Sequence, residues 1–294
     1  FYPPDPASLK FSTLGGNVAE NAGGPRCVKY GVTRDFVMGL EIVLPTGEII
    51  RTGGETYKGV VGYDMTRLLC GSEGTLGVIT KIIFKLLPLP EAKKTMLTIF
   101  DSIDGAAKAV SSIIGNKIIP TTLEFMDYAT LKCVNNRFNL GIPESGRAVL
   151  IIEVDGDYDL IEKQAARIQE IIAPLGLVEC KIAKDAAESE ALWKVRRLVS
   201  PSLRDVNPDK FNEDVVVPRS KVPEIIRVIE KIQQKYDIPI VNFGHAGDGN
   251  IHVNVMIDKN VPGMEAKAHE AIAEVFQAAL DLNGTMSGEH GVGL

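Results

Sequence analysis

Two short stretches near the C-terminal end concentrate the residues whose types and spacing could do chemistry. The first, "NFGHAGDGNIHVN" (residues 242–254), places His245 and His252 on either side of a Gly-Asp-Gly turn, with Asn254 just beyond. The preceding "IPIVNF" is apolar and β-branched, which predicts a buried strand that carries His245 at its carboxyl end. The following "IHVNVMI" alternates, so His252 and Asn254 share one face of a second strand. A reversal at the glycines would bring two imidazoles and an amide together.

The second stretch, "MSGEHGVG" (residues 286–293), places Glu289 directly before His290. Neighbours in an extended backbone point to opposite sides, so one could bind a metal while the other faces a substrate. His245, His252 and Glu289 would form a two-histidine, one-carboxylate set, which is typical of a catalytic divalent cation. A single histidine is more often a core or loop residue, and that interpretation stays open for each. A phosphate loop is disfavoured because no helix begins after the glycines, and His269 is interpreted as a solvated helix residue.

Composition limits the partners. Of the 294 residues 45% are hydrophobic, and the net charge is −6 with acidic and basic residues interspersed, which argues against nucleic acid. The four cysteines are scattered without a C-x-x-C pair, which favours a reducing compartment; we expect a cytoplasmic protein and leave peripheral membrane association open. No apolar run approaches the ~20 residues of a membrane helix. The chain opens on Phe1 within what reads as a loop, so we expect part of a longer protein.

The composition and the expected secondary structure change near residue 90. Residues 1–90 are glycine-rich, with a hairpin expected in "DFVMGLEIVLPTGEIIRTG" and a strand after "CGSEGTLG". From 91 to 294 strands alternate with helices, which predicts an α+β layer built from two related halves. Expected helices cover 103–115, about 158–174, 188–199 (ended by Pro201), 220–236 and about 264–282. Expected strands are "TMLTIF", "TTLEFMD", "RAVLIIEVDG", 177–183, "EDVVVP", "IPIVNF" and "IHVNVMI".

The motifs "GHAGDGNIHVN" and "SGEHGVG" together resemble the FAD-linked D-2-hydroxyacid dehydrogenases, flavoproteins of the vanillyl-alcohol-oxidase type. The glycine loops "GGNVAENAGGPRCVKYG" and "GSEGTLGVIT" resemble the second half of that family's FAD-binding domain, and the resemblance covers essentially the whole chain. It implies the C-terminal part of an FAD-binding domain at 1–90, followed at 91–294 by a ferredoxin-like α+β substrate and metal-binding domain.

The same resemblance implies a set of cofactor contacts. No histidine or cysteine stands in a family attachment position, so the FAD is expected to be non-covalent. A "PRGGGTS"-like phosphate loop lies outside this chain, which leaves FAD binding by the chain alone in doubt. The metal is expected to be zinc, with manganese or iron as alternatives. The residues carried over as FAD contacts are Pro3, Asp5, Gly16, Asn17, Asn21, Gly24, Gly31, Glu73, Gly74, Gly77 and Ile79.

The family likeness also implies substrate residues. "LWKVRR" resembles a W-x-x-R segment in which Arg196 grips the substrate carboxylate, with Trp193 and Ser200 on the same helical face. "DKFNEDVVVP" offers Lys210 as a second anchor, and Asn254 would orient the substrate. His290 is the expected general base for the hydroxyl proton. Glu124, in "TTLEFMD", matches a family pattern without an assigned role.

The expected activity is oxidation of a D-2-hydroxy acid, D-lactate or glycolate, to the 2-oxo acid, with hydride transfer to the flavin. The electron acceptor stays open among a quinone, a cytochrome, an electron-transfer flavoprotein and an iron–sulfur subunit, and a homodimer is compatible with the sequence. Two other classes remain. A non-haem iron oxygenase also uses two histidines and a carboxylate, and a non-catalytic flavoprotein subunit could relay electrons within a larger redox complex.

Overall fold

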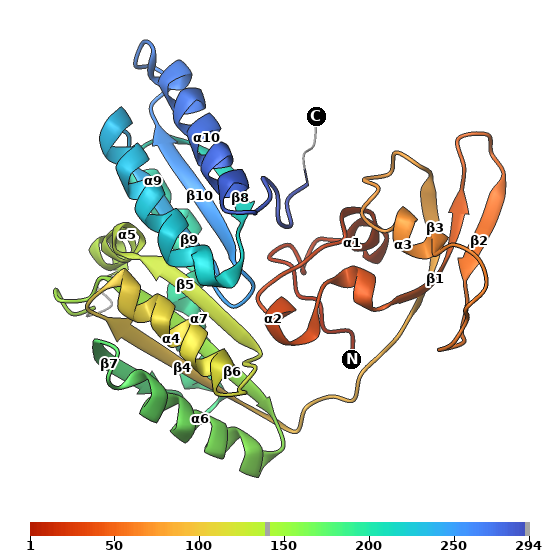
Figure 1. The fold of residues 1–294 in the computed structure, drawn as a ribbon, viewed down its shortest axis with the longest axis horizontal. Helices are drawn as coiled ribbons and strands as arrows, with labels where there is room; N and C mark the ends of the chain where they lie inside the picture. Colours follow the sequence, from red (N-terminus) through yellow and green to blue (C-terminus); the bar gives the residue numbers. More distant parts are fainter. Residues whose placement is uncertain (139–141, 292–294) are drawn as a thin grey trace. The chain divides into compact units, whose positions relative to one another are not determined.

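The structure, a computed structural model, describes residues 1–138 and 142–291. The chain divides into two compact units (Figure 1). The first contains Phe1–Leu89 together with Glu289, His290 and Gly291, and the second contains Pro90–Gly288.

The first unit holds a three-stranded antiparallel sheet in the order β2-β1-β3. Its strands are β1 (Val37–Val43), β2 (Ile49–Gly53) and β3 (Val78–Phe84). The predicted hairpin is confirmed: the Leu44 amide donates to the Glu48 carbonyl at 2.9 Å, and Gly47 takes a φ of 87° in the turn between them.

Short helices complete the first unit, and hydrophobic periodicity could not predict them because none exceeds two turns. Thr13 caps the first by accepting a bond from the Gly16 amide at 3.0 Å, and Asp64 caps the third by accepting from Arg67 at 2.9 Å. A small core joins helices and sheet through Val18, Leu40 and Leu69. The helices are α1 (Leu14–Glu20), α2 (Cys27–Tyr30) and α3 (Met65–Leu69), with a 3₁₀ turn at Thr33–Asp35.

The second unit is built on a seven-stranded antiparallel sheet in the order β7-β4-β6-β5-β9-β10-β8. The strands are β4 (Ala92–Phe100), β5 (Thr122–Asp127), β6 (Ala148–Gly156), β7 (Leu177–Ile182), β8 (Asp209–Val216), β9 (Ile240–His245) and β10 (Asn250–Ile257). Each predicted strand of this region is present, with boundaries that differ by a few residues.

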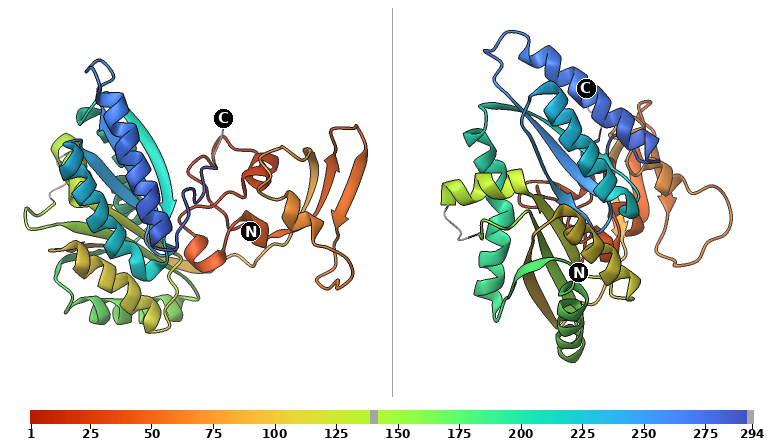
Figure 2. Two further views of the ribbon diagram at one scale, coloured as in Figure 1. Left: turned by 45° about the horizontal axis from the view of Figure 1, so that its top comes forward. Right: turned by 60° about the vertical axis from the view of Figure 1, so that its left-hand side comes forward.

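Helices cover both faces of this sheet (Figures 1 and 2). One face packs its larger hydrophobic cluster against α4 (Ile103–Gly115), α6 (Tyr158–Ile172), α9 (Val222–Tyr236) and α10 (Met264–Asp281). The other face packs a smaller cluster against α5 (Tyr128–Phe138), α7 (Ala186–Arg197) and α8 (Val199–Ser202). Short 3₁₀ turns lie at Leu203–Asp205 and Arg219–Lys221. The smaller cluster leaves part of its face for polar side chains.

The sheet consists of two halves of the same kind, which confirms the predicted α+β class. In the first half the chain runs through β4, α4, β5, α5, β6, α6 and β7. Apart from the additional α5, this succession and the strand order β7-β4-β6-β5 are those of a ferredoxin-like unit. In the second half β8, α9, β9, β10 and α10 repeat the pattern, and Thr285 and Ser287 bridge to β8 where a fourth strand would lie. The halves join through β5 and β9.

Two local expectations need correction. Helix α5, which lies between β5 and β6 and buries Thr130, Leu131 and Val134, was not expected from the sequence. Pro201 does not end the preceding helix: α7 ends at Arg197, and Pro201 lies in the first turn of α8, where a missing amide hydrogen costs little. The helix over 264–282 is confirmed, and His269 on it is exposed and packs against the Phe211 ring.

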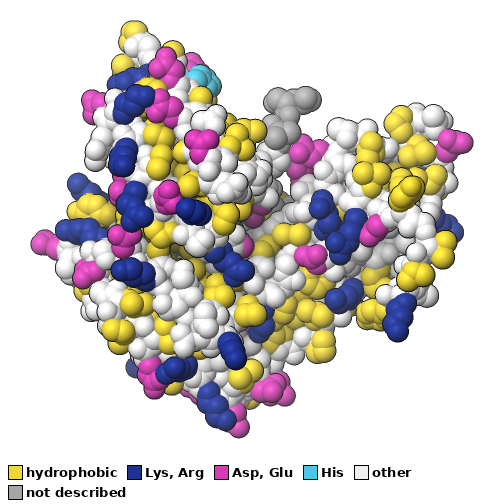
Figure 3. Space-filling view, viewed as in Figure 1, with side chains coloured by type: hydrophobic (Ala, Val, Ile, Leu, Met, Phe, Trp, Pro, Cys, Tyr) yellow, Lys and Arg dark blue, Asp and Glu magenta, His cyan; other side chains and the backbone are white. Residues whose placement is uncertain are grey.

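Surface and thiol chemistry agree with the composition. On the second unit, lysine and arginine side chains alternate with acidic ones across the face in Figure 3. The four cysteines are free thiols, and burial raises the pKa of Cys70, Cys133 and Cys180, so these thiols stay protonated. Within the described part of the chain, no helix combines the length and the apolar character needed to span a membrane.

Candidate functional site

The β9–β10 hairpin brings His245 and His252 together, as predicted. His245 is the last residue of β9, and its carbonyl accepts bonds from Asp248 and Gly249 at 3.1 and 3.0 Å, which close the turn. Only glycine fits at 249, because its φ is +90° and a Cβ there would lie 2.0 Å from the Val217 carbonyl oxygen. The two imidazole rings meet edge to face, with centroids 5.1 Å apart.

The register explains why the histidines share a face. His252 on β10 lies opposite Phe243 on β9. Phe243 precedes His245 by two residues, so the two histidines are diagonal neighbours on the same side of the sheet. Ile251, Val253 and Val255 point to the opposite side, into the larger cluster. The predicted alternation of β10 is therefore confirmed, and the polar residues lie on the face of the smaller cluster.

Glu124 contacts His245 directly. The two residues are paired across β5 and β9, and the His245 Nδ1 is hydrogen-bonded to the Glu124 Oε1. The other carboxylate oxygen accepts a bond from the Arg196 Nε at 2.8 Å. Burial alone would raise the pKa of Glu124, but the electrostatic attraction of His245 and Arg196 and the hydrogen bonds to both outweigh burial and lower that pKa to about 2. Glu124 therefore stays ionised.

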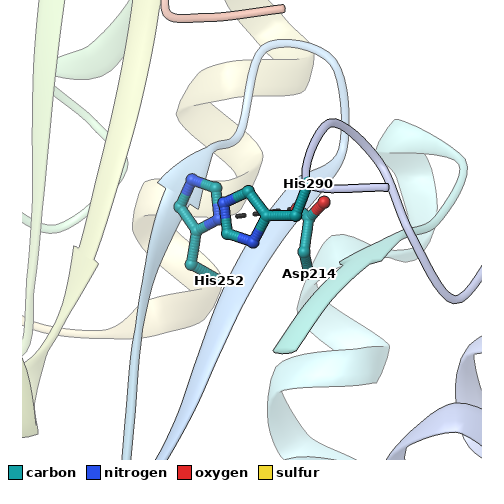
Figure 4. A group of neighbouring side chains, drawn as sticks. All are labelled: Asp214, His252 and His290. Atoms are coloured by element: carbon teal, nitrogen blue, oxygen red, sulfur yellow. Dashed lines mark ion pairs between the residues drawn. The ribbon is translucent and has the colours of Figure 1, made fainter. Parts of the chain in front are cut away.

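Asp214 stands in the corresponding place beside His252 (Figure 4). The residues are paired across β8 and β10, and the His252 Nδ1 lies 3.5 Å from the Asp214 Oδ1. Asn250 donates to the same oxygen at 2.5 Å, and the Gly288 amide donates to the Asp214 Oδ2 at 2.9 Å. The buried carboxylate thus anchors the chain one residue before Glu289.

Two predicted substrate anchors border the histidines. Arg196 reaches the face from α7 and lies over the Phe243 ring at 4.5 Å; its two terminal nitrogens have no hydrogen-bond partner among the described residues. Within the described part of the chain, the Lys210 ammonium bonds only the Asn254 side-chain oxygen, at 3.3 Å, and partial burial lowers the pKa of Lys210. Both side chains can therefore still donate hydrogen bonds to a bound anion.

Asn254 and Ser200 lie differently from the simple expectation. Asn254 is fully buried, and its amide nitrogen donates to the Val241 and His252 carbonyls at 3.2 and 3.4 Å, so its clearest contact with the site is through Lys210. Ser200 is exposed on α8, beyond the end of α7. Trp193 packs inward instead and donates from its ring nitrogen to buried Glu153 at 3.0 Å.

Glu124 and Asp214 could not be placed beside the histidines from the sequence. Glu124 carried no assigned role and Asp214 was not singled out, because strand pairing between distant segments decides which residue faces each histidine.

Several predicted FAD contacts of the first unit pack tightly against protein backbone. A Cβ at Gly24 would lie 2.4 Å from the Asp5 carbonyl oxygen, and one at Gly77 would lie 2.7 Å from the Val43 carbonyl. Asp5 also accepts from the Arg26 amide at 3.1 Å. Close packing thus accounts for these glycines without a cofactor, and their role as FAD contacts stays a prediction.

The other predicted FAD contacts also have defined surroundings. Asn21 adopts a left-handed conformation with φ of 51° and accepts from the Arg34 amide at 2.9 Å. Gly31 has a φ of 88° beside Asp35, and Ile79 pairs with Ile42 in the sheet. Pro3 is buried, and Glu73 and Gly74 lie in a turn where both have a positive φ. Their role as FAD contacts stays a prediction.

Gly16 and Asn17 line a cavity of about 390 Å³ in the first unit. A Cβ at Gly16 would lie 3.2 Å from the Thr13 hydroxyl, and one at Gly23 would lie 3.0 Å from the Glu289 carboxylate, so side chains there would fill the hollow. The small residues and polar groups that line this cavity would suit part of a dinucleotide cofactor. The complete lining is Pro6, Ala7, Ser8, Ser12, Thr13, Gly16, Asn17, Glu20, Ala22, Gly23, Glu289 and His290.

The fold is that of known flavoproteins. A p-cresol methylhydroxylase structure aligns with a TM-score of 0.74 and 16% identity over 95% of this chain and 62% of its own. An alkyldihydroxyacetonephosphate synthase structure aligns with a TM-score of 0.69 and 20% identity, over 97% of this chain and 56% of its own. These two alignments show that the chain shares the fold of both structures.

Sequence comparison identifies the family. Residues 89–294 match the model for FAD linked oxidases, C-terminal domain, and residues 1–53 match an FAD binding domain. The chain belongs to the FAD-linked oxidase family, as the motifs predicted. It is 49% identical over its whole length to the glycolate oxidase subunit GlcD of Bacillus subtilis (strain 168), and 33% identical over 99% of its length to a D-lactate dehydrogenase of Anaerostipes hadrus. It spans 62% and 63% of these relatives.

Proposed function

We propose that the whole protein oxidises a small D-2-hydroxy acid, D-lactate or glycolate, to the 2-oxo acid with FAD as cofactor. The observation that carries the proposal is the row of side chains on one sheet face, where His245 and His252 lie beside two cations with unused hydrogen-bonding capacity, Arg196 and Lys210. An imidazole pair beside cations suits a hydroxyl next to a carboxylate. The relatives named glycolate oxidase subunit and D-lactate dehydrogenase support the same substrate class.

Different residues of the chain would bind the substrate, hold the cation and accept the proton. Arg196 and Lys210 would hold the substrate carboxylate and so orient its C2 carbon, while Asn254 would fix the Lys210 ammonium. His245 and His252, with Glu289 as the predicted third ligand, would hold a divalent cation, for which zinc is the first choice. His290 would accept the hydroxyl proton on a ring nitrogen. When bound, FAD would accept the hydride from C2, and the cation would stabilise negative charge on the hydroxyl oxygen.

The donor chemistry supports a cation at the histidine pair. A carboxylate that accepts from Nδ1, as Glu124 does from His245, leaves the Nε2 lone pair for a metal. The predicted third ligand follows Gly288, whose amide is bonded to Asp214 in the same unit as the histidines.

The direct test is anaerobic mixing of the full-length, FAD-loaded protein with a panel of D- and L-2-hydroxy acids and with achiral glycolate. We expect rapid bleaching of the flavin absorbance by D-lactate or by glycolate, and little by L-lactate. If no hydroxy acid bleaches a preparation with verified FAD and metal content, the activity is excluded and an electron-relaying subunit becomes the better account.

The His290→Ala variant tests the proton acceptor. Loss of a general base should slow flavin reduction by roughly 10²–10⁴-fold, while metal content and FAD content stay at the wild-type level. His269→Ala serves as the control, because His269 is exposed on α10 and its ring packs on Phe211. An unchanged rate of flavin reduction in His290→Ala would remove His290 from this role.

A further inference from the structure

Each histidine of the β9–β10 hairpin has a carboxylate directly opposite it, on the strand that flanks the hairpin on that side. The sheet order β5-β9-β10-β8 places Glu124 beside His245 on one side and Asp214 beside His252 on the other. All four residues are at most 6% exposed. Buried carboxylates are costly unless ionic or hydrogen-bonding partners compensate, so their matched placement calls for a function.

We propose that Glu124 and Asp214 are positioning residues that fix the two imidazoles for the cation and couple each to a second part of the site. Glu124 accepts from the His245 Nδ1 and from the Arg196 Nε, so one carboxylate sets both a metal ligand and the substrate clamp. Asp214 lies by the His252 Nδ1 and accepts from the Gly288 amide, so it links the second imidazole to the segment that leads to Glu289. The inference rests on the cation of the proposed function.

The chemistry of the contacts supports this arrangement. The His245 Nδ1 is hydrogen-bonded to the Glu124 carboxylate, and with the ring hydrogen on Nδ1 the Nε2 atom keeps its lone pair. Carboxylates behind metal-bound histidines fix the ring and raise its basicity, and their removal typically weakens metal binding by about 10–100-fold. The His252–Asp214 contact, at 3.5 Å, is longer than an ordinary hydrogen bond, so we expect the smaller effect there.

The test compares Glu124→Gln and Asp214→Asn in the full-length protein, with Zn²⁺ affinity measured by competition with a chromophoric chelator. We expect Zn²⁺ dissociation constants raised by about 10–100-fold for Glu124→Gln, and by a smaller factor in that range for Asp214→Asn. The matched control is Glu153→Gln. Glu153 is equally buried and accepts from Trp193, Lys93 and Thr95, so its loss should leave Zn²⁺ affinity unchanged.

Further measurements separate positioning from general loss of structure. In a His245→Ala background, Glu124→Gln should cause no additional loss of Zn²⁺ affinity, because the ring it orients is gone. The visible spectrum of the Co²⁺-substituted protein should change in Glu124→Gln and stay unchanged in Glu153→Gln. The same Glu124→Gln variant should raise KM, since Arg196 loses its ionic partner.

Zn²⁺ affinities of both variants equal to that of Glu153→Gln would overturn the inference, as would absence of Zn²⁺ binding by the wild-type protein. If Glu124→Gln does not fold, the Asp214→Asn affinity and spectrum decide alone. Zn²⁺ affinity is measured without turnover, so a panel of hydroxy acids that fails to bleach the flavin would refute the proposed function and leave this inference standing.

Discussion

Lys210 illustrates how one residue's environment carries a functional prediction. Its ammonium is partly buried, yet it bonds only the neutral Asn254 amide among the described residues. Lys210→Met keeps the aliphatic stem and removes the charge. We therefore expect KM for the hydroxy acid to rise by roughly 10–100-fold, the loss of one charge-assisted hydrogen bond, with little change in stability.

Steady-state kinetics with the preferred hydroxy acid measure this effect. Lys259→Met is the matched control, because Lys259 lies nearby over the Phe211 ring and is exposed. Equal KM values in the two variants would show that Lys210 does not bind the substrate.

Asp127 gives a prediction about stability and pH at the end of β5. Its carboxylate accepts two bonds from Thr130 at 2.8 Å and two from Asn242 at 2.9 and 3.0 Å. Asp127→Asn replaces one of the two accepting oxygens by an NH2 group, which then faces the donors of either Thr130 or Asn242. We therefore expect the free energy of unfolding to fall by about 1–3 kcal/mol.

The pH dependence follows from the pKa of Asp127, which burial raises from its ordinary value of 3.8 despite these bonds. The folded state then holds the proton more tightly than the unfolded state, so stability falls as pH rises through the folded pKa. Asparagine does not titrate. The advantage of the wild type over Asp127→Asn should therefore be largest below pH 3.8 and shrink above it; denaturant unfolding at several pH values measures this. A constant difference would contradict the assignment.

At the scale of elements, the hairpin between β9 and β10 controls the histidine pair. Gly249→Ala forces a side chain into a left-handed conformation with its Cβ 2.0 Å from the Val217 carbonyl oxygen. We expect a loss of at least about 1–3 kcal/mol in the free energy of unfolding, and weaker Zn²⁺ binding by the folded fraction, because the register that pairs the imidazoles shifts.

Thermal unfolding and chelator competition report on the two effects. Gly115→Ala is the control, since that glycine ends α4 in open space at an ordinary helical conformation, where alanine is the better residue by up to ~1 kcal/mol. A Gly249→Ala protein as stable as Gly115→Ala would mean that the turn tolerates a side chain.

The same elements indicate what the sequence could predict. Alternation in β10 and the apolar run of β9 were enough to place His245 and His252 on one face, because both are local patterns. Glu124 lies 121 residues before His245 in the chain, and its contact depends on β5 pairing with β9, a non-local choice. Asp214 depends in the same way on the pairing of β8 with β10. Local periodicity thus predicted the histidine pair and missed the two carboxylates that lie beside it.

At the scale of the whole molecule, the two units have separate cores. Both clusters of the second unit draw only on residues between Ala92 and Leu282, and the cluster of the first unit draws on residues between Val18 and Phe84. A sheet covered on both faces by its own helices does not need the first unit to exclude water from its core. We therefore expect residues 90–288, expressed alone, to fold cooperatively.

Trp193 reports on this prediction because it is the one tryptophan of the sequence and is hydrogen-bonded to buried Glu153. Its fluorescence should follow a single denaturant transition in the fragment, with a midpoint close to that of the same signal in the longer chain. Because the fragment ends before Glu289, its Zn²⁺ affinity should lie below that of the longer chain even when its fold is intact, which separates the fold of the sheet from completion of the cation site. A fragment without a cooperative transition would show that the sheet needs the first unit to fold, and an undiminished Zn²⁺ affinity would exclude Glu289 as a ligand.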